Sequence, residues 1–167
     1  MEIERKFLLD GFPNLAPKSE SVMFQGYIST MPTVRIRSKT SASGKTTYKL
    51  TFKSAGEIVR QETEISITKK VYTELLNLLE APPIKKIKKT YALEGGLTLE
   101  CSFVDIEDDS FYYAEVEFPS VEEAEKFVPP SFLGKEITFD NAYKMNNVYA
   151  RYAAKYAEKR KAKKQPQ

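Results

Sequence analysis

The most constraining feature of this chain is a two-residue alternation of polar and apolar side chains that returns in eight separate segments. It starts at the N-terminus, where Glu2, Glu4 and Lys6 occupy every second position. Because side chains of a β-strand point alternately to its two faces, these three charges share one face. The pattern predicts strands over residues 1–8, 22–29, 33–39, 45–53, 58–67, 84–93, 97–105 and 111–118.

Each predicted strand has one polar, mostly charged face and one apolar face. The remaining polar faces carry Gln25 and Tyr27; Arg35 and Arg37; Lys49 and Lys53; Arg60, Glu62 and Glu64; Lys86 and Lys88; Glu100 and Ser102; Glu115 and Glu117. Turn signals such as Ser-Ala-Ser-Gly at 41–44 and Glu-Gly-Gly at 94–96 separate neighbouring strands. We therefore expect a mainly β, antiparallel fold.

The charged faces have two interpretations. An open antiparallel sheet would place them in water. However, the charges are sorted by strand into cation pairs and acid pairs, and like charges two residues apart repel unless a counter-charged ligand or metal lies between them. A closed barrel with its charged faces inside would explain this sorting, and the pattern alone leaves both arrangements open.

Three helices are expected at residues 68–80, 120–128 and 141–162. The first ends before two prolines, and the second opens with the capping-box pattern Ser120-x-x-Glu123. The third carries a stripe that we interpret as packing surface, formed by Met145, Tyr149, Tyr152 and Tyr156.

The chain shows neither a repeat nor a linker, which predicts one domain over residues 1–158 followed by a basic tail at 159–167. The tail holds five cations and no acid, and we interpret it as a solvated helix end, with a binding role as the alternative. Residues 1–158 carry 21 basic and 23 acidic side chains, so no nucleic-acid partner is expected.

Composition excludes several kinds of chemistry. The 167 residues include no histidine and only one cysteine, Cys101, so histidine-ligated zinc, cysteine-rich metal sites and intramolecular disulfides are excluded. A metal ion would have to be a hard, oxygen-ligated ion such as Mg²⁺ or Mn²⁺. The sequence has no apolar run of membrane-spanning length and no signal-peptide pattern, so we expect a cytoplasmic protein without a membrane partner.

At this point the motifs resemble a known family. Glu2-Ile-Glu-Arg-Lys6 is similar to the N-terminal ExExK motif of the CYTH superfamily, the triphosphate tunnel metalloenzymes. The resemblance continues in order to about residue 146, through Arg35-x-Arg37, Lys49-x-x-x-Lys53, Arg60-x-Glu62-x-Glu64, the Lys86 and Lys88 strand, Ala114-Glu-Val-Glu-Phe118 and Leu133-Gly-Lys-Glu-Ile-Thr138.

The resemblance implies an eight-stranded antiparallel closed β-barrel with a charged interior, peripheral helices and a C-terminal helix. It implies hydrolysis of inorganic tripolyphosphate or a small organic triphosphate to diphosphate and phosphate, with Mg²⁺ or Mn²⁺. Two alternatives from other classes are an adenylyl cyclase of class IV type and a non-catalytic module that binds polyphosphate or nucleotide. A monomer or a homodimer is expected.

The resemblance also assigns roles to residues. Phosphate binding is expected of Lys6, Arg35, Arg37, Lys49, Lys53, Arg60, Lys88 and Lys135. Metal binding is expected of Glu2, Glu4, Glu62, Glu64, Glu115 and Glu117. Tyr27 and Lys86 best match a Lys–Tyr pair that is associated in the family with tripolyphosphatase activity. The alternative for Tyr27 is simple packing at the end of the tunnel.

Two departures from the family pattern affect single positions. Ser102 stands where an aspartate is common, and the nearby Asp105 has the opposite strand phase. The lysine run 85–89 leaves the strand register ambiguous, and parity favours Lys86 and Lys88 as the residues that face inward.

Overall fold

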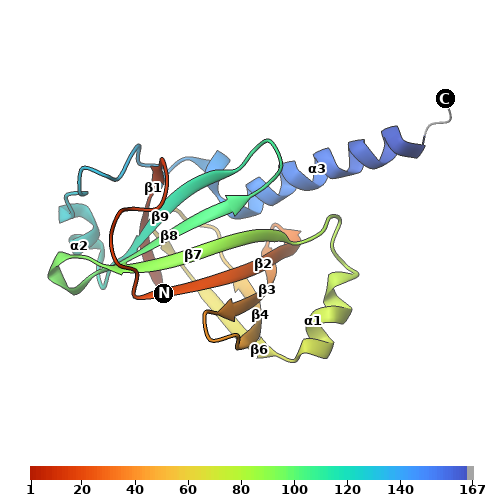
Figure 1. Ribbon diagram of the computed structural model, residues 1–167, viewed down its shortest axis with the longest axis horizontal. Helices are drawn as coiled ribbons and strands as arrows, with labels where there is room; N and C mark the ends of the chain where they lie inside the picture. The colour runs from red at the N-terminus through yellow and green to blue at the C-terminus, as the bar shows by residue number, and fades with distance from the viewer. Residues whose placement is uncertain (165–167) are drawn as a thin grey trace.

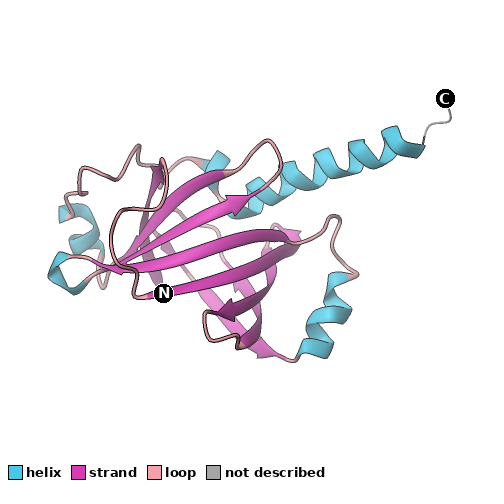
Figure 2. Cartoon of the chain, viewed as in Figure 1, coloured by secondary structure: helices cyan, strands magenta, loops and turns pink. Residues whose placement is uncertain are grey.

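One antiparallel sheet, strongly curved, dominates the molecule (Figures 1 and 2). The computed structural model describes residues 1–164. Its strands are β1 (Glu2–Leu9), β2 (Ser19–Thr30), β3 (Thr33–Ser41), β4 (Thr46–Lys53), β5 (Val59–Arg60), β6 (Glu62–Ile67), β7 (Ile84–Ala92), β8 (Thr98–Asp105) and β9 (Phe111–Glu117). They are ordered β5-β1-β9-β8-β7-β2-β3-β4-β6.

The segment 59–67 closes this sheet into a barrel. Its first part, β5, pairs with β1 through Arg60 and Glu2, whereas its second part, β6, pairs with β4 at the opposite edge through Glu62 and Lys53. Only Gln61 separates the two parts. The eight expected strands are therefore all present, and the count of nine arises because one expected strand changes partner at Gln61.

The helices are α1 (Lys69–Leu76), α2 (Val121–Lys126) and α3 (Met145–Lys164), with short 3₁₀ turns at Glu94–Gly96 and Asn141–Tyr143. The predicted helices at 68–80 and 120–128 are confirmed with shorter bounds. Ser120 caps α2 as the capping-box pattern predicted, accepting a hydrogen bond from the Glu123 amide at 3.2 Å. None of the helices within residues 1–164 is long and apolar enough to span a membrane.

The apolar strand faces point outward and are covered by helices and loops. Under α2 they form a core cluster that includes Phe7, Leu99, Val116 and Ala124. Near α1, a Cβ on Gly26 would lie 2.4 Å from a methyl group of Leu79, so the glycine leaves room for Leu79 in its present position. The outward apolar faces confirm the closed-barrel interpretation of the alternating pattern.

The interior has an apolar end beneath the start of α3. Met145, Val148 and Tyr149 pack there against inward-facing residues such as Ile84 and Val104. The predicted packing role of the α3 stripe is thus confirmed.

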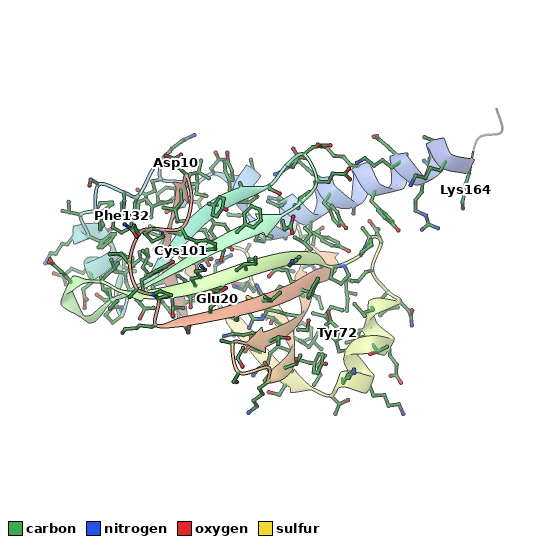
Figure 3. All side chains as sticks on the ribbon, viewed as in Figure 1. Asp10, Glu20, Tyr72, Cys101, Phe132 and Lys164 are labelled. Atoms are coloured by element: carbon green, nitrogen blue, oxygen red, sulfur yellow. The ribbon has the colours of Figure 1, made fainter. Side chains whose placement is uncertain are left out.

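Beyond this contact α3 extends away from the barrel (Figure 1), and Lys164 lies at its far end (Figure 3). The expected tail continues as helix to residue 164 and is exposed from residue 157 on, as a solvated helix end would be. Residues 165–167 lie outside the described residues.

Candidate active site

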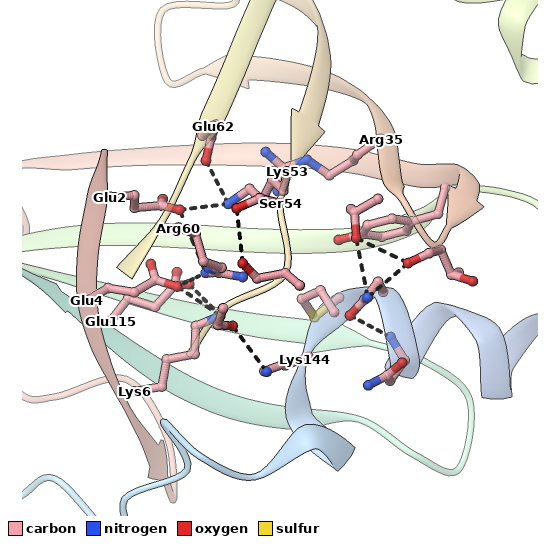
Figure 4. A pocket seen from close by; sticks show the side chains of 18 of the residues that line it. Glu2, Glu4, Lys6, Arg35, Lys53, Ser54, Arg60, Glu62, Glu115 and Lys144 are labelled. Atoms are coloured by element: carbon pink, nitrogen blue, oxygen red, sulfur yellow. Dashed lines mark hydrogen bonds and ion pairs between the residues drawn. The ribbon is translucent and has the colours of Figure 1, made fainter. Parts of the chain in front are cut away.

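A cavity of about 670 Å³ occupies the charged part of the barrel interior (Figure 4). Besides the strands, its lining includes the turn at 30–33, the loop at 54–56 and the segment 141–147 that leads into α3. Eight cationic side chains line it: Lys6, Arg35, Arg37, Lys53, Arg60, Lys86, Lys88 and Lys144. Seven carboxylates line it as well: Glu2, Glu4, Glu62, Glu64, Glu100, Glu115 and Glu117.

The carboxylates and most of the cations occupy different parts of the barrel wall. All seven carboxylates come from β1, β6, β8 and β9, which are contiguous around the closed barrel together with β5 and which we call the acidic wall. The other four strands, β7, β2, β3 and β4, contribute no carboxylate to the cavity lining. Cations reach the cavity from β7, β3 and β4, and we call the four strands together the basic wall.

Within the acidic wall, the carboxylates hold cations from the same wall. Lys6 Nζ lies 3.0 Å from Glu115 Oε1 and 3.5 Å from Glu4 Oε1. Arg60 pairs with Glu4 and lies 3.7 Å from Glu2 Oε2. Burial disfavours the charged form of Lys6, but the Glu115 and Glu4 carboxylates outweigh it and raise the pKa of Lys6.

Ion pairs also cross the two junctions between the walls. Lys53 on β4 lies 2.7 Å from Glu62 Oε2 and 3.0 Å from Glu2 Oε2. At the other junction Lys88 on β7 pairs with Glu100 on β8. The closest charges of opposite sign thus neutralise each other along both boundaries.

Two cations in the basic wall have no such partner. Arg35 and Lys86 are only 8% and 4% exposed, and neither forms an ion pair with a carboxylate of the described chain. Arg35 has Thr51 Oγ1 at 3.5 Å, and Lys86 donates a hydrogen bond of 3.1 Å to the Tyr113 hydroxyl. Burial, reinforced by the neighbouring Lys88, holds the pKa of Lys86 well below the ordinary lysine value.

The carboxylates lie in two electrostatic situations. The pKa of Glu115 is lowered because Lys6, Lys88 and Lys86 outweigh the effect of its burial. The pKa of Glu117 is raised, first by burial and then by the Glu2 and Glu100 carboxylates. Within residues 1–164 no three acidic side chains are already grouped closely enough to hold a metal ion, since most are engaged in ion pairs.

The structure brings every predicted site residue to the cavity except Lys49 and Lys135. Lys49 faces inward beyond the cavity and lies 3.4 Å from Glu64. Lys135 is 72% exposed, with Asp140 at 3.9 Å, because the segment around it runs along the edge of β1 and turns this side chain outward. Lys86 and Lys88 both face the cavity, as parity predicted.

The predicted contact between Tyr27 and Lys86 is not formed. In the pairing of β2 with β7, Lys86 lies opposite Met23, which is four residues before Tyr27. Four residues of a strand span about 13 Å, and no hydrogen bond joins the two side chains in the described chain. Lys86 instead contacts Tyr113, while the Tyr27 ring packs against Tyr149 of α3, with ring centroids 5.4 Å apart.

The structure also shows where Ser102 and Asp105 lie, at the position where the sequence departs from the aspartate common in the family. The ladder between β7 and β8 runs without a bulge, so Asp105 pairs with Lys85 and keeps its outward phase. Ser102 is fully buried and faces inward between Lys88 and Tyr113 in the ladder. Asp105 therefore does not replace the missing aspartate.

Three titratable residues of the cavity lining, Tyr113, Glu100 and Lys144, were not predicted as site residues. Tyr113 and Glu100 share strand parity with Glu115 and Ser102 respectively, so the alternating pattern contained a signal for both. Lys144 lies on an irregular segment before α3, and its Nζ donates to the Gly56 carbonyl at 3.2 Å. No periodic pattern pointed to it.

A closed β-barrel whose interior holds a basic wall facing an acidic wall defines the class of this protein. Known proteins agree with this class. The chain is 35% identical over 143 residues to an inorganic triphosphatase of Nitrosomonas europaea, a match that covers 86% of this chain and 93% of the relative. The chain therefore belongs to the CYTH superfamily, the triphosphate tunnel metalloenzymes.

Solved structures show the same fold. A crystal structure of an inorganic triphosphatase matches with a TM-score of 0.63 and 29% identity, over 89% of this chain and 94% of its own. A Hippeastrum protein, named as an adenylyl cyclase that reveals a dominant triphosphatase activity, matches in fold with a TM-score of 0.53 and 18% identity, over 75% of this chain and 83% of its own. No family model matches the chain.

Proposed function

We propose that this protein hydrolyses inorganic tripolyphosphate to diphosphate and phosphate with the help of a divalent metal ion. The observation that carries the proposal is the pair of buried cations, Arg35 and Lys86, which lack a carboxylate partner in the described chain. A buried charge without a counter-ion is costly, and a bound anion supplies the missing charge. A phosphate chain in the cavity satisfies both residues at once.

The substrate lies against the basic wall in this proposal. Arg35 and Arg37 occupy alternate positions of β3, and their planar guanidinium groups suit two-point contacts with phosphate oxygens. Lys86 and Lys88 on β7 and Lys53 on β4 add point charges around the same cavity. Lys6 and Arg60 reach the substrate from the acidic wall as their carboxylate partners turn to metal.

The donor set of the acidic wall fits a hard divalent ion such as Mg²⁺ or Mn²⁺. Carboxylate oxygens are its preferred protein ligands. Burial and then the neighbouring carboxylates raise the pKa of Glu117, and a cation beside it would offset both effects. The proposed ligands are Glu2, Glu4, Glu62, Glu64, Glu115 and Glu117. When bound, the metal neutralises phosphate charge and lowers the pKa of a bound water to yield the nucleophile.

The chain's own residues stabilise the leaving diphosphate. Cations of the basic wall are already directed into the cavity and neutralise the charge that develops on the leaving oxygen. Tyr113, hydrogen-bonded to Lys86, fixes the direction of the lysine ammonium. We therefore assign Lys86 to the reacting end of the substrate and give Tyr113 the orienting role first expected of Tyr27.

The two alternatives are less well supported. The relative that is 35% identical over most of both chains is an inorganic triphosphatase, which favours hydrolysis over cyclisation or simple binding. A cyclase would convert ATP without releasing orthophosphate, and a binding module would release none from any substrate.

Orthophosphate release tests the proposal. Tripolyphosphate, ATP and thiamine triphosphate are supplied in parallel with Mg²⁺, with Mn²⁺ or with EDTA. We expect rapid release from tripolyphosphate with either metal, slower release from the other two substrates, and none in EDTA. Equal release in EDTA would contradict the metal requirement, and no release under any condition would contradict triphosphatase activity.

A further inference from the structure

Gln25 lies beside the arginines that are proposed to bind phosphate. It is fully buried on β2 and shares strand parity with Tyr27, which lines the cavity, so its side chain faces the barrel interior. It does not itself line the cavity. Its ladder partner on β3 is Arg37, and Cα atoms paired in this way are about 4.5–5.5 Å apart.

Both polar atoms of the Gln25 amide lack a hydrogen-bond partner within the described chain, and so do Nε of Arg35 and Nε of Arg37. Buried polar groups in folded proteins are almost always paired, so four unpaired atoms on two adjacent strands form an unusual group. The group is complementary, because Gln25 Oε1 is an acceptor and each arginine Nε–H is a donor.

The present side-chain positions explain why these bonds are not made. The Arg37 guanidinium is drawn to Glu64, with NH2 3.1 Å from Oε2, and that of Arg35 lies beside the Thr51 hydroxyl at 3.5 Å. A phosphate chain in the cavity offers both guanidinium groups a stronger partner and draws that of Arg37 away from Glu64 on β6. Arg37, freed from Glu64, can then present its Nε–H to the neighbouring amide.

We propose that Gln25 is a positioning residue for triphosphate binding, whose Oε1 accepts the Nε–H of Arg37 once phosphate has replaced Glu64. The amide then holds the guanidinium fork against the phosphate oxygens. This inference rests on the proposed function, since it names a residue that acts through the phosphate-binding arginine.

The test compares Gln25→Met, which keeps the side-chain length and removes the amide, with the control Met23→Leu. Met23 is also fully buried on the same face of β2, two residues earlier. Melting temperature is measured without ligand and with tripolyphosphate in EDTA, and KM and kcat are measured with Mg²⁺. We expect Gln25→Met to melt at or above the wild-type temperature without ligand, because it removes unpaired polar atoms.

With tripolyphosphate, the melting temperature of Gln25→Met should rise less than that of the wild type. Its KM should increase about tenfold, as for the loss of one hydrogen bond to a charged group, with kcat changed less than about threefold. Met23→Leu should keep the wild-type ligand shift and KM.

Two results would overturn the inference in distinguishable ways. A ligand shift and KM equal to wild type in Gln25→Met, with a lower melting temperature without ligand, would make Gln25 a structural residue only. A wild-type protein that shows neither a tripolyphosphate-induced shift nor phosphate release would overturn the proposed function, and the inference with it.

Discussion

The acidic wall and the basic wall of the barrel differ in how completely their charges are paired. In the acidic wall Glu4 and Glu115 each contact a cation from a neighbouring strand. In the basic wall Arg35 and Lys86 are more than nine-tenths buried and form no ion pair in the described chain. Most carboxylates of the acidic wall are held in ion pairs, whereas two buried cations of the basic wall have no carboxylate partner in the described chain.

This difference in charge pairing indicates the order in which the phosphates and the metal ion bind. An anion can bind Arg35 and Lys86 of the basic wall without breaking an ion pair, whereas a metal ion must displace cations from most carboxylates of the acidic wall before it reaches them. We therefore expect the phosphates to bind first or together with the metal, since phosphates accept the cations that the metal displaces. Variants in the two walls, and pairs of variants within one wall, should therefore differ in their effects.

The largest effect is expected from Glu4→Gln in the acidic wall. The change keeps the side-chain size and removes the charge of a proposed metal ligand, so kcat/KM for tripolyphosphate should fall about 100-fold or more. Phosphate release over a range of Mg²⁺ concentrations measures it. Glu122→Gln, at a position 74% exposed, is the matched control and should match wild type. Near-wild-type turnover in Glu4→Gln would exclude a metal-ligand role.

In the basic wall, Lys86→Met should change stability and activity in opposite directions. Removing the unpaired cation should lower kcat/KM about 30-fold while the ligand-free protein becomes more stable at neutral pH. Lys88→Met instead breaks the pair with Glu100 and should lower stability. Urea unfolding and phosphate release on both variants measure the two effects. A loss of stability in Lys86→Met would show that this lysine is paired after all.

The lowered pKa of Lys86 also predicts a pH dependence of stability. Between that lowered pKa and the ordinary value of 10.5, the unfolded chain binds more protons than the folded chain. The free energy of unfolding of the wild type should therefore gain a rising contribution with pH in this window, and Lys86→Met should lack it. Urea unfolding of both proteins between about pH 7 and pH 10 isolates the contribution as a difference. Parallel profiles would contradict the lowered pKa.

A moderate effect should distinguish two tyrosines. Tyr113→Phe removes the hydroxyl that accepts from Lys86 and should lower kcat about three- to tenfold. Tyr27→Phe removes a hydroxyl that does not contact Lys86 and should stay within about twofold of wild type. A larger loss of kcat in Tyr27→Phe than in Tyr113→Phe would instead favour Tyr27 as the functional partner of Lys86, as first expected. A double-mutant cycle of Tyr113→Phe with Lys86→Met should be non-additive.

The smallest effect is expected at Lys144, which lines the cavity beside the loop at 54–56. Lys144→Ala should raise KM for tripolyphosphate about three- to fivefold with little change in kcat, since the partly exposed ammonium contributes only modest binding energy. Lys135→Ala, on the exposed lysine first expected to bind phosphate, is the control and should leave KM unchanged. A larger effect at Lys135 than at Lys144 would reverse this assignment.

Much of the barrel could be predicted because its charged faces follow strict strand parity. Arg35, Glu62 and Glu115 were placed inside by that alternation together with the family motifs, and the same parity resolved the Lys86 and Lys88 register. Parity says nothing about offsets between strands, so the Lys86 contact to Tyr113 rather than Tyr27 required the register of the ladders. Lys144 and Lys135 lie on irregular segments, where no period constrains the direction of a side chain.

The central claim is that the two walls have separate tasks, with the basic wall binding phosphate and the acidic wall binding metal. Calorimetric titration of tripolyphosphate in EDTA tests it directly on wild type, Arg35→Met and Glu4→Gln. We predict that wild type binds, that Glu4→Gln stays within about threefold of it, and that Arg35→Met loses at least about tenfold in affinity. Equal losses in the two variants, or no binding by wild type, would contradict the separation of the two walls.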